Sequence, residues 1–256
     1  GVTPGSGLRV ATGLTVTALD DTPASDGVYY YGATSLDSSG NESGLSEVAS
    51  ALSDRVAPTA AIATATGTVT TGSYPLTFTL SKPLASVPIL LFVANGAGPQ
   101  AVSLSASSPT VWTGTLTVTA ATAYGAATFQ FQGTDFAGNS GTSITAGRTL
   151  FVDNRGPIGA VTLYPFSPLK AGEADLALIL DEPAVSTPTL AFVIAATTYP
   201  VTLEGAGTTW IATITIPSGV NGTAYFVSAA TDALGNRGTT LSSGGSFVID
   251  TTAPGA

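Results

Sequence analysis

One short sequence pattern occurs three times in this chain and limits its fold more than any other feature. The pattern begins with Asp-x-x-Gly-Asn and ends with Asp-x-x-x-Pro, and its copies occupy residues 37–58, 135–157 and 232–254. The first Asp precedes the second by 17, 18 and 18 residues, and successive copies begin 98 and 97 residues apart. This period is the length of one small domain, so the pattern predicts similar domains joined by short proline-containing linkers.

The repeat divides the 256 residues into parts 1–54, 55–154 and 155–256. The two later parts match in register, because Leu-Ser-Lys-Pro at 80–83 corresponds to Leu-Asp-Glu-Pro at 180–183, and Trp112 corresponds to Trp210. The first part is about half as long as the others and has sequence for three strands. We therefore predict one partial module followed by two complete ones.

Apolar and polar residues alternate in short runs, as in Leu-Thr-Phe-Thr-Leu at 76–80. A period of two is typical of strands with one buried face, and Gly and Pro separate the runs. We find no helical period. The sequence thus predicts an all-β chain of tandem β-sandwiches with any helix confined to short turns.

Several motifs resemble known bacterial modules. Residues 29–31 (Tyr-Tyr-Tyr), 37–43 and 46–50 resemble the back half of a fibronectin type III module. Residues 55–256 are similar to bacterial immunoglobulin-like repeats in the strand end at 80–83, the Trp-containing strand, the Asp-x-x-Gly-Asn turn and the linker. The resemblance implies immunoglobulin-like and fibronectin-like sandwiches from a secreted or cell-surface bacterial protein.

Composition excludes several functions. Only 9% of residues are charged and the net charge is −9, which disfavours binding to nucleic acid or anionic membranes. No apolar run approaches the ~20 residues of a membrane helix. The chain contains no His, Cys or Met and begins at Gly1 without a signal-like segment, so we expect a processed or excised piece without disulfides.

We expect no enzyme activity. The absence of His and Cys removes the usual general base and nucleophile arrangements. Carboxylate pairs occur at 20–21 and 181–182, where we expect solvated charges in turns. No required cofactor is predicted.

Aromatic residues have two interpretations. Trp112 and Trp210 lie at matched positions of two copies, which favours a core or sheet-face role over a sugar-stacking platform. Tyr30 should face opposite to Tyr29 and Tyr31 on a strand, with one Tyr tucked against the fold or, alternatively, an aromatic contact surface for a partner.

The acidic turns are the candidate metal sites. The turn before the last strand of a sandwich lies at the pole where the chain enters, so Asp135 should lie near Asp54, and Asp232 near Asp153. These carboxylates either form turns through their own backbone amides or bind calcium at the junctions.

We predict a structural module of a bacterial surface filament, stalk or adhesin. Its expected partners are other copies of itself, neighbouring modules of a larger chain, or a surface polysaccharide or host-cell ligand. The incomplete sheet of residues 1–54 would be completed by an upstream segment or by strand addition from a second copy. The alternative is an accessory or carbohydrate-binding region of a large secreted hydrolase.

Overall fold

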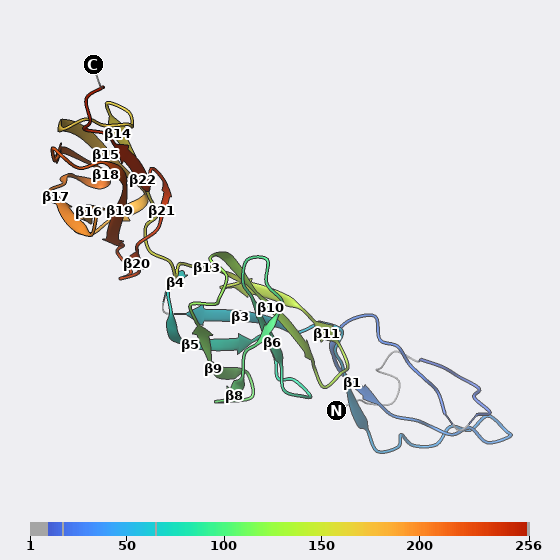
Figure 1. Cartoon of the computed structure of the whole chain (residues 1–256). Coiled ribbons are helices and arrows are strands. Elements are labelled where there is room, and N and C mark those ends of the chain that lie inside the picture. Colours follow the sequence, from blue (N-terminus) through green and yellow to red (C-terminus); the bar gives the residue numbers. More distant parts are fainter. Residues whose placement is uncertain (1–9, 17, 65, 255–256) are drawn as a thin grey trace.

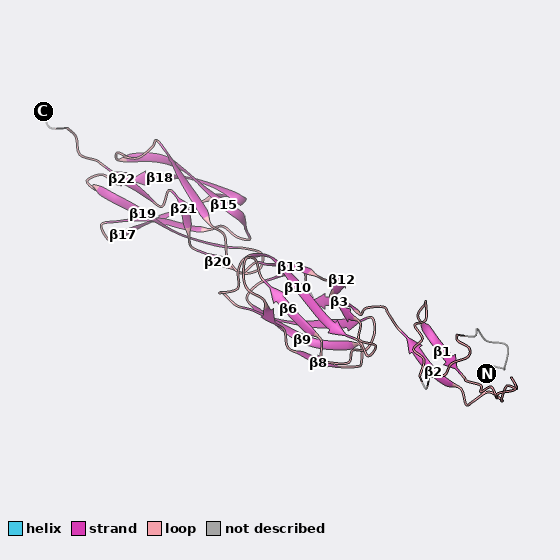
Figure 2. Ribbon diagram, turned by 90° about the vertical axis from the view of Figure 1, so that its right-hand side faces the viewer, coloured by secondary structure: helices cyan, strands magenta, loops and turns pink. Residues whose placement is uncertain are grey.

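The computed structural model describes residues 10–16, 18–64 and 66–254, and it consists of β-strands and connecting loops (Figure 1). No helix occurs among these residues, and hence none that could cross a membrane. Three units follow one another along an extended path (Figure 2). The predicted all-β fold of tandem β-sandwiches is confirmed.

The N-terminal unit contains two paired strands, β1 (Gly27–Tyr31) and β2 (Ala49–Ser53). Leu14, Val16 and Ala18 alternate with polar residues and so predict a further strand, but the described residues of this segment form none and have no partner strand. None of the described residues of this unit is buried. Alternation alone was insufficient because a strand needs a neighbour for its backbone hydrogen bonds.

The second unit is a sandwich of two sheets. One sheet has the order β12 (Ser143–Ala146), β3 (Thr59–Thr64), β5 (Gly72–Leu80), β9 (Val111–Val118), β8 (Leu104–Ala106). The other has the order β4 (Thr68–Val69), β13 (Thr149–Val152), β10 (Gly125–Thr134), β6 (Ile89–Val93), β7 (Gln100–Ala101), with β11 (Ser140–Gly141) paired to β10.

The alternation seen in the sequence becomes the core of this sandwich. Leu76, Phe78 and Leu80 are buried on β5 while the residues between them are exposed. The Phe78 ring lies 5.5 Å from that of Phe131 on the facing sheet. Burial of each such side chain contributes about 1.5–3 kcal/mol, so the inward faces hold the two sheets together.

The third unit repeats the plan. One sheet contains β18 (Glu204–Ile216), β15 (Gly172–Ala184), β14 (Gly159–Tyr164) and β21 (Leu241–Ser243). The other contains β17 (Thr197–Val201), β16 (Thr189–Ile194), β19 (Gly222–Thr231) and β20 (Arg237–Gly238), with β22 (Ser246–Ile249) paired to β19. Its core is a separate cluster that includes Phe192, Phe226, Phe247 and Trp210.

The two sandwiches close in the same way. β12 pairs parallel with β3, and β21 pairs parallel with β14 at the matched position. Just before these strands, β11 and β20 bring the chain against the incoming linker. A Cβ on Gly141 would lie 1.9 Å from the Pro58 carbonyl oxygen, and one on Gly238 would lie 2.0 Å from that of Pro157. Glycine at both positions therefore lets each linker pass directly beside the turn of its own sandwich.

Candidate functional site

The candidate site is the junction at which a linker enters a sandwich. We call residues 54–58 with the turn 135–139 the first junction, and residues 153–157 with the turn 232–236 the second junction. In each turn the Asp carboxylate holds the loop closed. Asp135 Oδ1 accepts hydrogen bonds from the amides of Ala137 (3.0 Å) and Asn139 (2.9 Å). The side chain therefore shapes its own turn, as the motif predicts.

The last residue of each turn binds the linker. Asn139 Nδ2 donates to the Asp54 carbonyl at 2.9 Å, and Asn236 Nδ2 donates to the Asp153 carbonyl at 3.0 Å. The structure thus brings together the pairs that the topology argument joined, Asp135 with Asp54 and Asp232 with Asp153. The same side chain makes the same bond in both sandwiches.

A lysine lies between the two carboxylates of the first junction. Lys82 Nζ donates to both oxygens of Asp54, at 2.6 and 2.8 Å, and to Asp135 Oδ2 at 3.1 Å. It also donates to the Val56 carbonyl. The hydrogen bond from the Asn139 side chain, with smaller effects from backbone amides and Lys82, lowers the pKa of Asp135 to about 2. An ammonium group therefore already occupies the position where the acid pair would hold a metal ion.

The second junction has a glutamate at the position that corresponds to this lysine. Ligand oxygens of Asp153, Glu182 and Asp232 all lie within 4.8 Å of one another. Glu182 is half-buried, so the prediction that the pair at 181–182 is a solvated turn was wrong for this residue: it lies inside β15. Burial, followed by repulsion from the nearby carboxylates of Asp153 and Asp232, raises the pKa of Glu182 to about 7.

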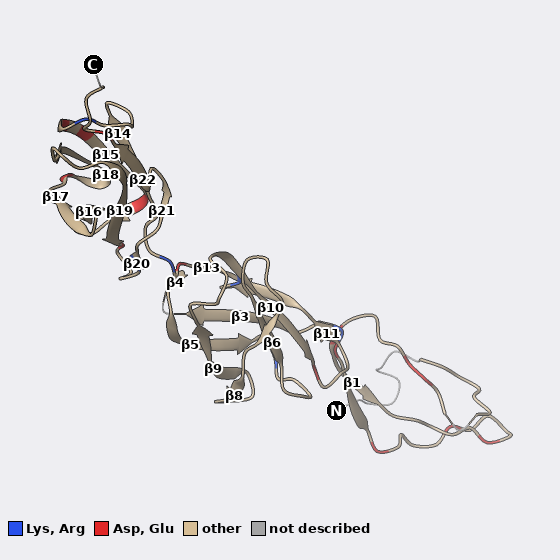
Figure 3. Ribbon diagram, in the orientation of Figure 1, with Lys and Arg blue, Asp and Glu red and all other residues tan. Residues whose placement is uncertain are grey.

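The linker of the second junction also contacts the preceding sandwich. Asn154 Nδ2 donates to the carbonyls of Thr119 (3.0 Å) and Thr122 (2.6 Å). The Arg155 guanidinium lies 4.1 Å above the ring of Tyr124 and pairs with Asp181 at 2.8 Å. The linker is therefore bonded to both sandwiches, and charged residues occur along it (Figure 3).

One hydrogen bond joins the two sandwiches directly. Thr70 Oγ1 of the second unit donates to Asn236 Oδ1 at 2.5 Å. Asn236 thus uses its amide nitrogen for the linker and its amide oxygen for the preceding unit. No sequence motif pointed to Thr70, because it lies 166 residues from its partner.

The tryptophans do not form a sugar platform. Trp210 is 4% exposed in the core, and its indole nitrogen donates to the Gly207 carbonyl at 3.2 Å. Trp112 is half-buried against the core of the second unit. Both have the predicted core or sheet-face role.

The tyrosines of β1 alternate as expected. Tyr30 is 61% exposed, while Tyr29 and Tyr31 face the opposite side and are half-buried. The Tyr29 hydroxyl donates to the Ser25 carbonyl and the Tyr31 hydroxyl to Asp21 Oδ2, each at 2.9 Å. These bonds tie the preceding loop to one face of the small sheet.

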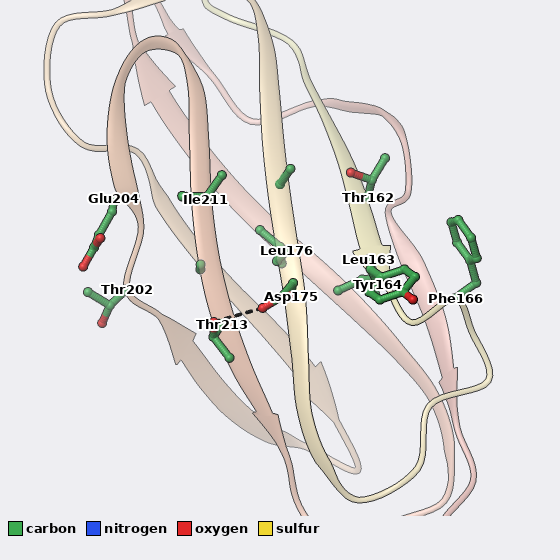
Figure 4. Close-up of a pocket in the computed structure, with 12 residues that line it drawn as sticks. Thr162, Leu163, Tyr164, Phe166, Asp175, Leu176, Thr202, Glu204, Ile211 and Thr213 are labelled. Atoms are coloured by element: carbon green, nitrogen blue, oxygen red, sulfur yellow. Dashed lines mark hydrogen bonds between the residues drawn. The ribbon is translucent and has the colours of Figure 1, made fainter.

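The third unit has a groove of about 830 Å³ that no sequence motif predicted (Figure 4). Tyr164 and Phe166 form one side of it, 68% and 77% exposed, with their rings edge to face at 6.3 Å. Its floor includes Asp175, whose carboxylate accepts from the Thr213 hydroxyl at 3.1 Å. The Tyr-Pro-Phe run at 164–166 was the available signal, since aromatic side chains beside proline at a strand end cannot all turn inward.

Comparison with known proteins gives a limited result. The sequence matches no protein-family model and no curated protein. Among the solved structures that it resembles is the "tetra-tandem repeat in extending region of large adhesion protein", with 16% sequence identity and a TM-score of 0.37. The match covers 89% of this chain and 58% of the adhesion-protein chain. This chain therefore spans less than two thirds of the length of that structure.

Proposed function

We propose that this chain is a spacer segment of an extracellular bacterial stalk, filament or adhesin, in which tandem sandwiches hold a defined direction. The hydrogen bond from Asn139 to the Asp54 carbonyl, repeated from Asn236 to the Asp153 carbonyl, carries the proposal. Each sandwich uses its own turn to fix the linker that enters it. These bonds fix the direction in which each linker enters its sandwich, and they come from residues of the chain itself.

The additional contacts at the second junction support the same role. Arg155 and Asn154 hold the linker to the preceding sandwich, and Thr70 bonds to Asn236 across the gap. A flexible tether would need none of these bonds, because a linker between independent domains is usually polar and makes few contacts. The extended path of the units in Figure 2 agrees with a spacer.

The proposed partners are neighbouring modules of a longer chain and other copies of this one. The β1–β2 sheet has an uncovered face formed by Val28, Tyr30 and Leu52, which are 55%, 61% and 69% exposed. A two-stranded sheet is marginal in water and needs further strands or a cover. We assign this face to a second copy of the chain, which would extend the spacer into a filament.

Small-angle X-ray scattering of the whole chain tests the spacer role. The wild-type chain should give an extended, narrow distance distribution. The double variant Asn139→Ala/Asn236→Ala should broaden it while the circular dichroism spectrum stays unchanged, because the side-chain bonds to the linkers, to Thr70 and to the turn aspartates are lost and both cores are left intact. Asn95→Ala is the matched control, since Asn95 Nδ2 bonds to the Tyr124 carbonyl within one sandwich. Superimposable profiles of the wild type and the double variant would refute the proposal.

One observation favours the alternative of a carbohydrate-binding region of a secreted hydrolase. The groove beside Tyr164 and Phe166 presents two exposed aromatic rings near an acidic and a hydroxyl side chain, which is the chemistry of a sugar site. Retention of the chain on insoluble polysaccharide, lost in Tyr164→Ala/Phe166→Ala, would favour this function. No retention on a panel of polysaccharides would leave the spacer as the better account.

A further inference from the structure

We propose that Asp153, Glu182 and Asp232 bind one calcium ion at the second junction, and that Lys82 replaces this ion at the first junction. The inference deepens the proposed spacer function, because the ion would brace a junction. The binding itself does not depend on that function.

The first argument is the arrangement of the oxygens. The three carboxylates meet within 4.8 Å although they come from the linker, the strand β15 and the turn after β19. Asp232 is 5% exposed, and its Oδ1 is fixed by the amides of Leu234 and Asn236, both at 2.8 Å. Three negative charges so close together repel one another strongly where water is excluded.

The second argument is that two of these oxygens lack a partner. Asp153 Oδ1 and Glu182 Oε1 are buried atoms with no hydrogen-bond donor among the described residues. An unpaired buried carboxylate oxygen is costly, and structures normally satisfy such an atom. The nearest arginine does not serve, because the Arg155 guanidinium pairs with Asp181 and stacks on Tyr124.

The third and independent argument is the first junction of the same chain. Its matched positions are Asp54, Lys82 and Asp135, and there a cation is present: the ammonium of Lys82 contacts both carboxylates. The repeat register aligns Lys82 with Glu182. The same position therefore carries the ammonium of Lys82 between two carboxylates in one sandwich and a third carboxylate, that of Glu182, in the other.

The Lys82 contacts also suggest a further ligand. Lys82 Nζ donates to the Val56 carbonyl as well as to the two acids. The residue that corresponds to Val56 in the second linker is Arg155, so its carbonyl is the expected backbone ligand. The full set would then contain three carboxylates and one carbonyl, with water completing the shell.

This donor set selects the ion. It contains only oxygen, and the chain has no His or Cys that could hold zinc. Calcium accepts six to eight oxygens in irregular geometry, whereas magnesium demands a near-ideal octahedron and keeps most of its water. Carboxylates contributed by three separate segments suit calcium better.

Isothermal titration of the chelator-treated, full 256-residue chain with calcium chloride tests the proposal. We expect one bound ion in the wild type and affinity weakened at least about tenfold in Glu182→Gln, which keeps the shape and removes the charge. Glu182→Lys should abolish binding, since it recreates the arrangement of the first junction. The reciprocal variant Lys82→Glu should bind two ions.

Circular dichroism of each variant controls for folding, and a magnesium titration controls for selectivity. No calcium binding by the wild type, or undiminished binding in both Glu182 variants, would overturn the site. A single ion in a folded Lys82→Glu variant would overturn the replacement by Lys82. A chain that binds calcium but whose scattering shows flexibly linked domains would refute the spacer role and not the metal site. The two proposals can therefore fail separately.

Discussion

Ala195 and Ala196 form the tight turn between β16 and β17 with φ of +46° and +65°. Turns of two residues with both φ values positive favour Asn and Gly, because a Cβ in the left-handed region costs about 1–2 kcal/mol. The matching hairpin of the second unit contains Gly96, with φ of +66°. The third unit thus has backbone strain in this turn that the second unit avoids.

Replacing Ala196 with Gly should stabilise the third unit by about 1 kcal/mol, because the strain relieved exceeds the added entropy of the unfolded chain. Chemical denaturation followed by tryptophan fluorescence measures the change. The control is Ala212→Gly, on the regular strand β18, which should destabilise. Equal destabilisation by both substitutions would contradict the interpretation of the turn.

The hydrogen bonds of the Asp135 carboxylate make the stability of the second unit depend on pH. The folded pKa of this carboxylate, about 2, lies below the ordinary value of 3.8, so between these values the unfolded chain binds more protons than the folded one. The stability that Asp135 contributes is complete above pH ~4. It is lost as the pH falls through 2.

The variants Asp135→Asn and Asn139→Ala should both flatten the decline in unfolding free energy between pH 4 and pH 2. The first removes the titrating group, and the second removes the hydrogen bond that contributes most to the low pKa. Urea denaturation at a series of pH values measures the slope. If both variants keep the wild-type slope, other carboxylates cause the acid sensitivity.

At the scale of elements, the β1–β2 sheet differs from every other sheet in the described residues because it encloses no core. Val28 and Leu52 are directly opposite each other in the register and both face solvent. The strands of the two sandwiches lie away from this small sheet in Figure 1. An open apolar sheet with free edges is a site for pairing with another chain.

The double variant Val28→Lys/Leu52→Lys should abolish self-association, since two charges on the face oppose burial. Sedimentation velocity across a range of concentrations should show association of the wild type and a monomer for the variant. The control is Val227→Lys, which adds a charge to an equally exposed position on β19. A wild type that stays monomeric at every concentration would refute assembly through this face.

At the scale of the whole molecule, the two sandwiches have separate cores, and the bonds described between them involve the second junction, with Thr70 of the second unit bonded to Asn236. Phe78 belongs to one core and Phe192 to the other. Removing either ring should cost about 3–5 kcal/mol within its own unit. The units should therefore unfold as separate cooperative blocks.

Differential scanning calorimetry of Phe78→Ala should show a lowered transition for the second unit and an unchanged one for the third. Phe192→Ala should give the converse. A shift of both transitions by either substitution would mean that the junction couples the sandwiches more strongly than its few hydrogen bonds suggest.

Much of this protein could be predicted from its sequence. Period-two alternation at residues 76–80 determines which side chains face inward, and this required no knowledge of distant contacts. The spacing of the acidic turns placed Asp135 beside Asp54 and Asp232 beside Asp153, because the strands of a sandwich run alternately from pole to pole. The fold class and the positions of the junctions thus follow from local pattern and topology.

The tertiary structure decided the chemistry of those junctions. Lys82 lies 28 residues from Asp54 and 53 from Asp135, so its role as a cation between them is not visible in any motif. The same position carries Glu182 in the next repeat. Its sequence predicts a solvated charge in a turn, whereas the structure half-buries it. Charge, burial and partner are properties of a position in space, since the energy of a carboxylate depends on which atoms surround it and how much water remains.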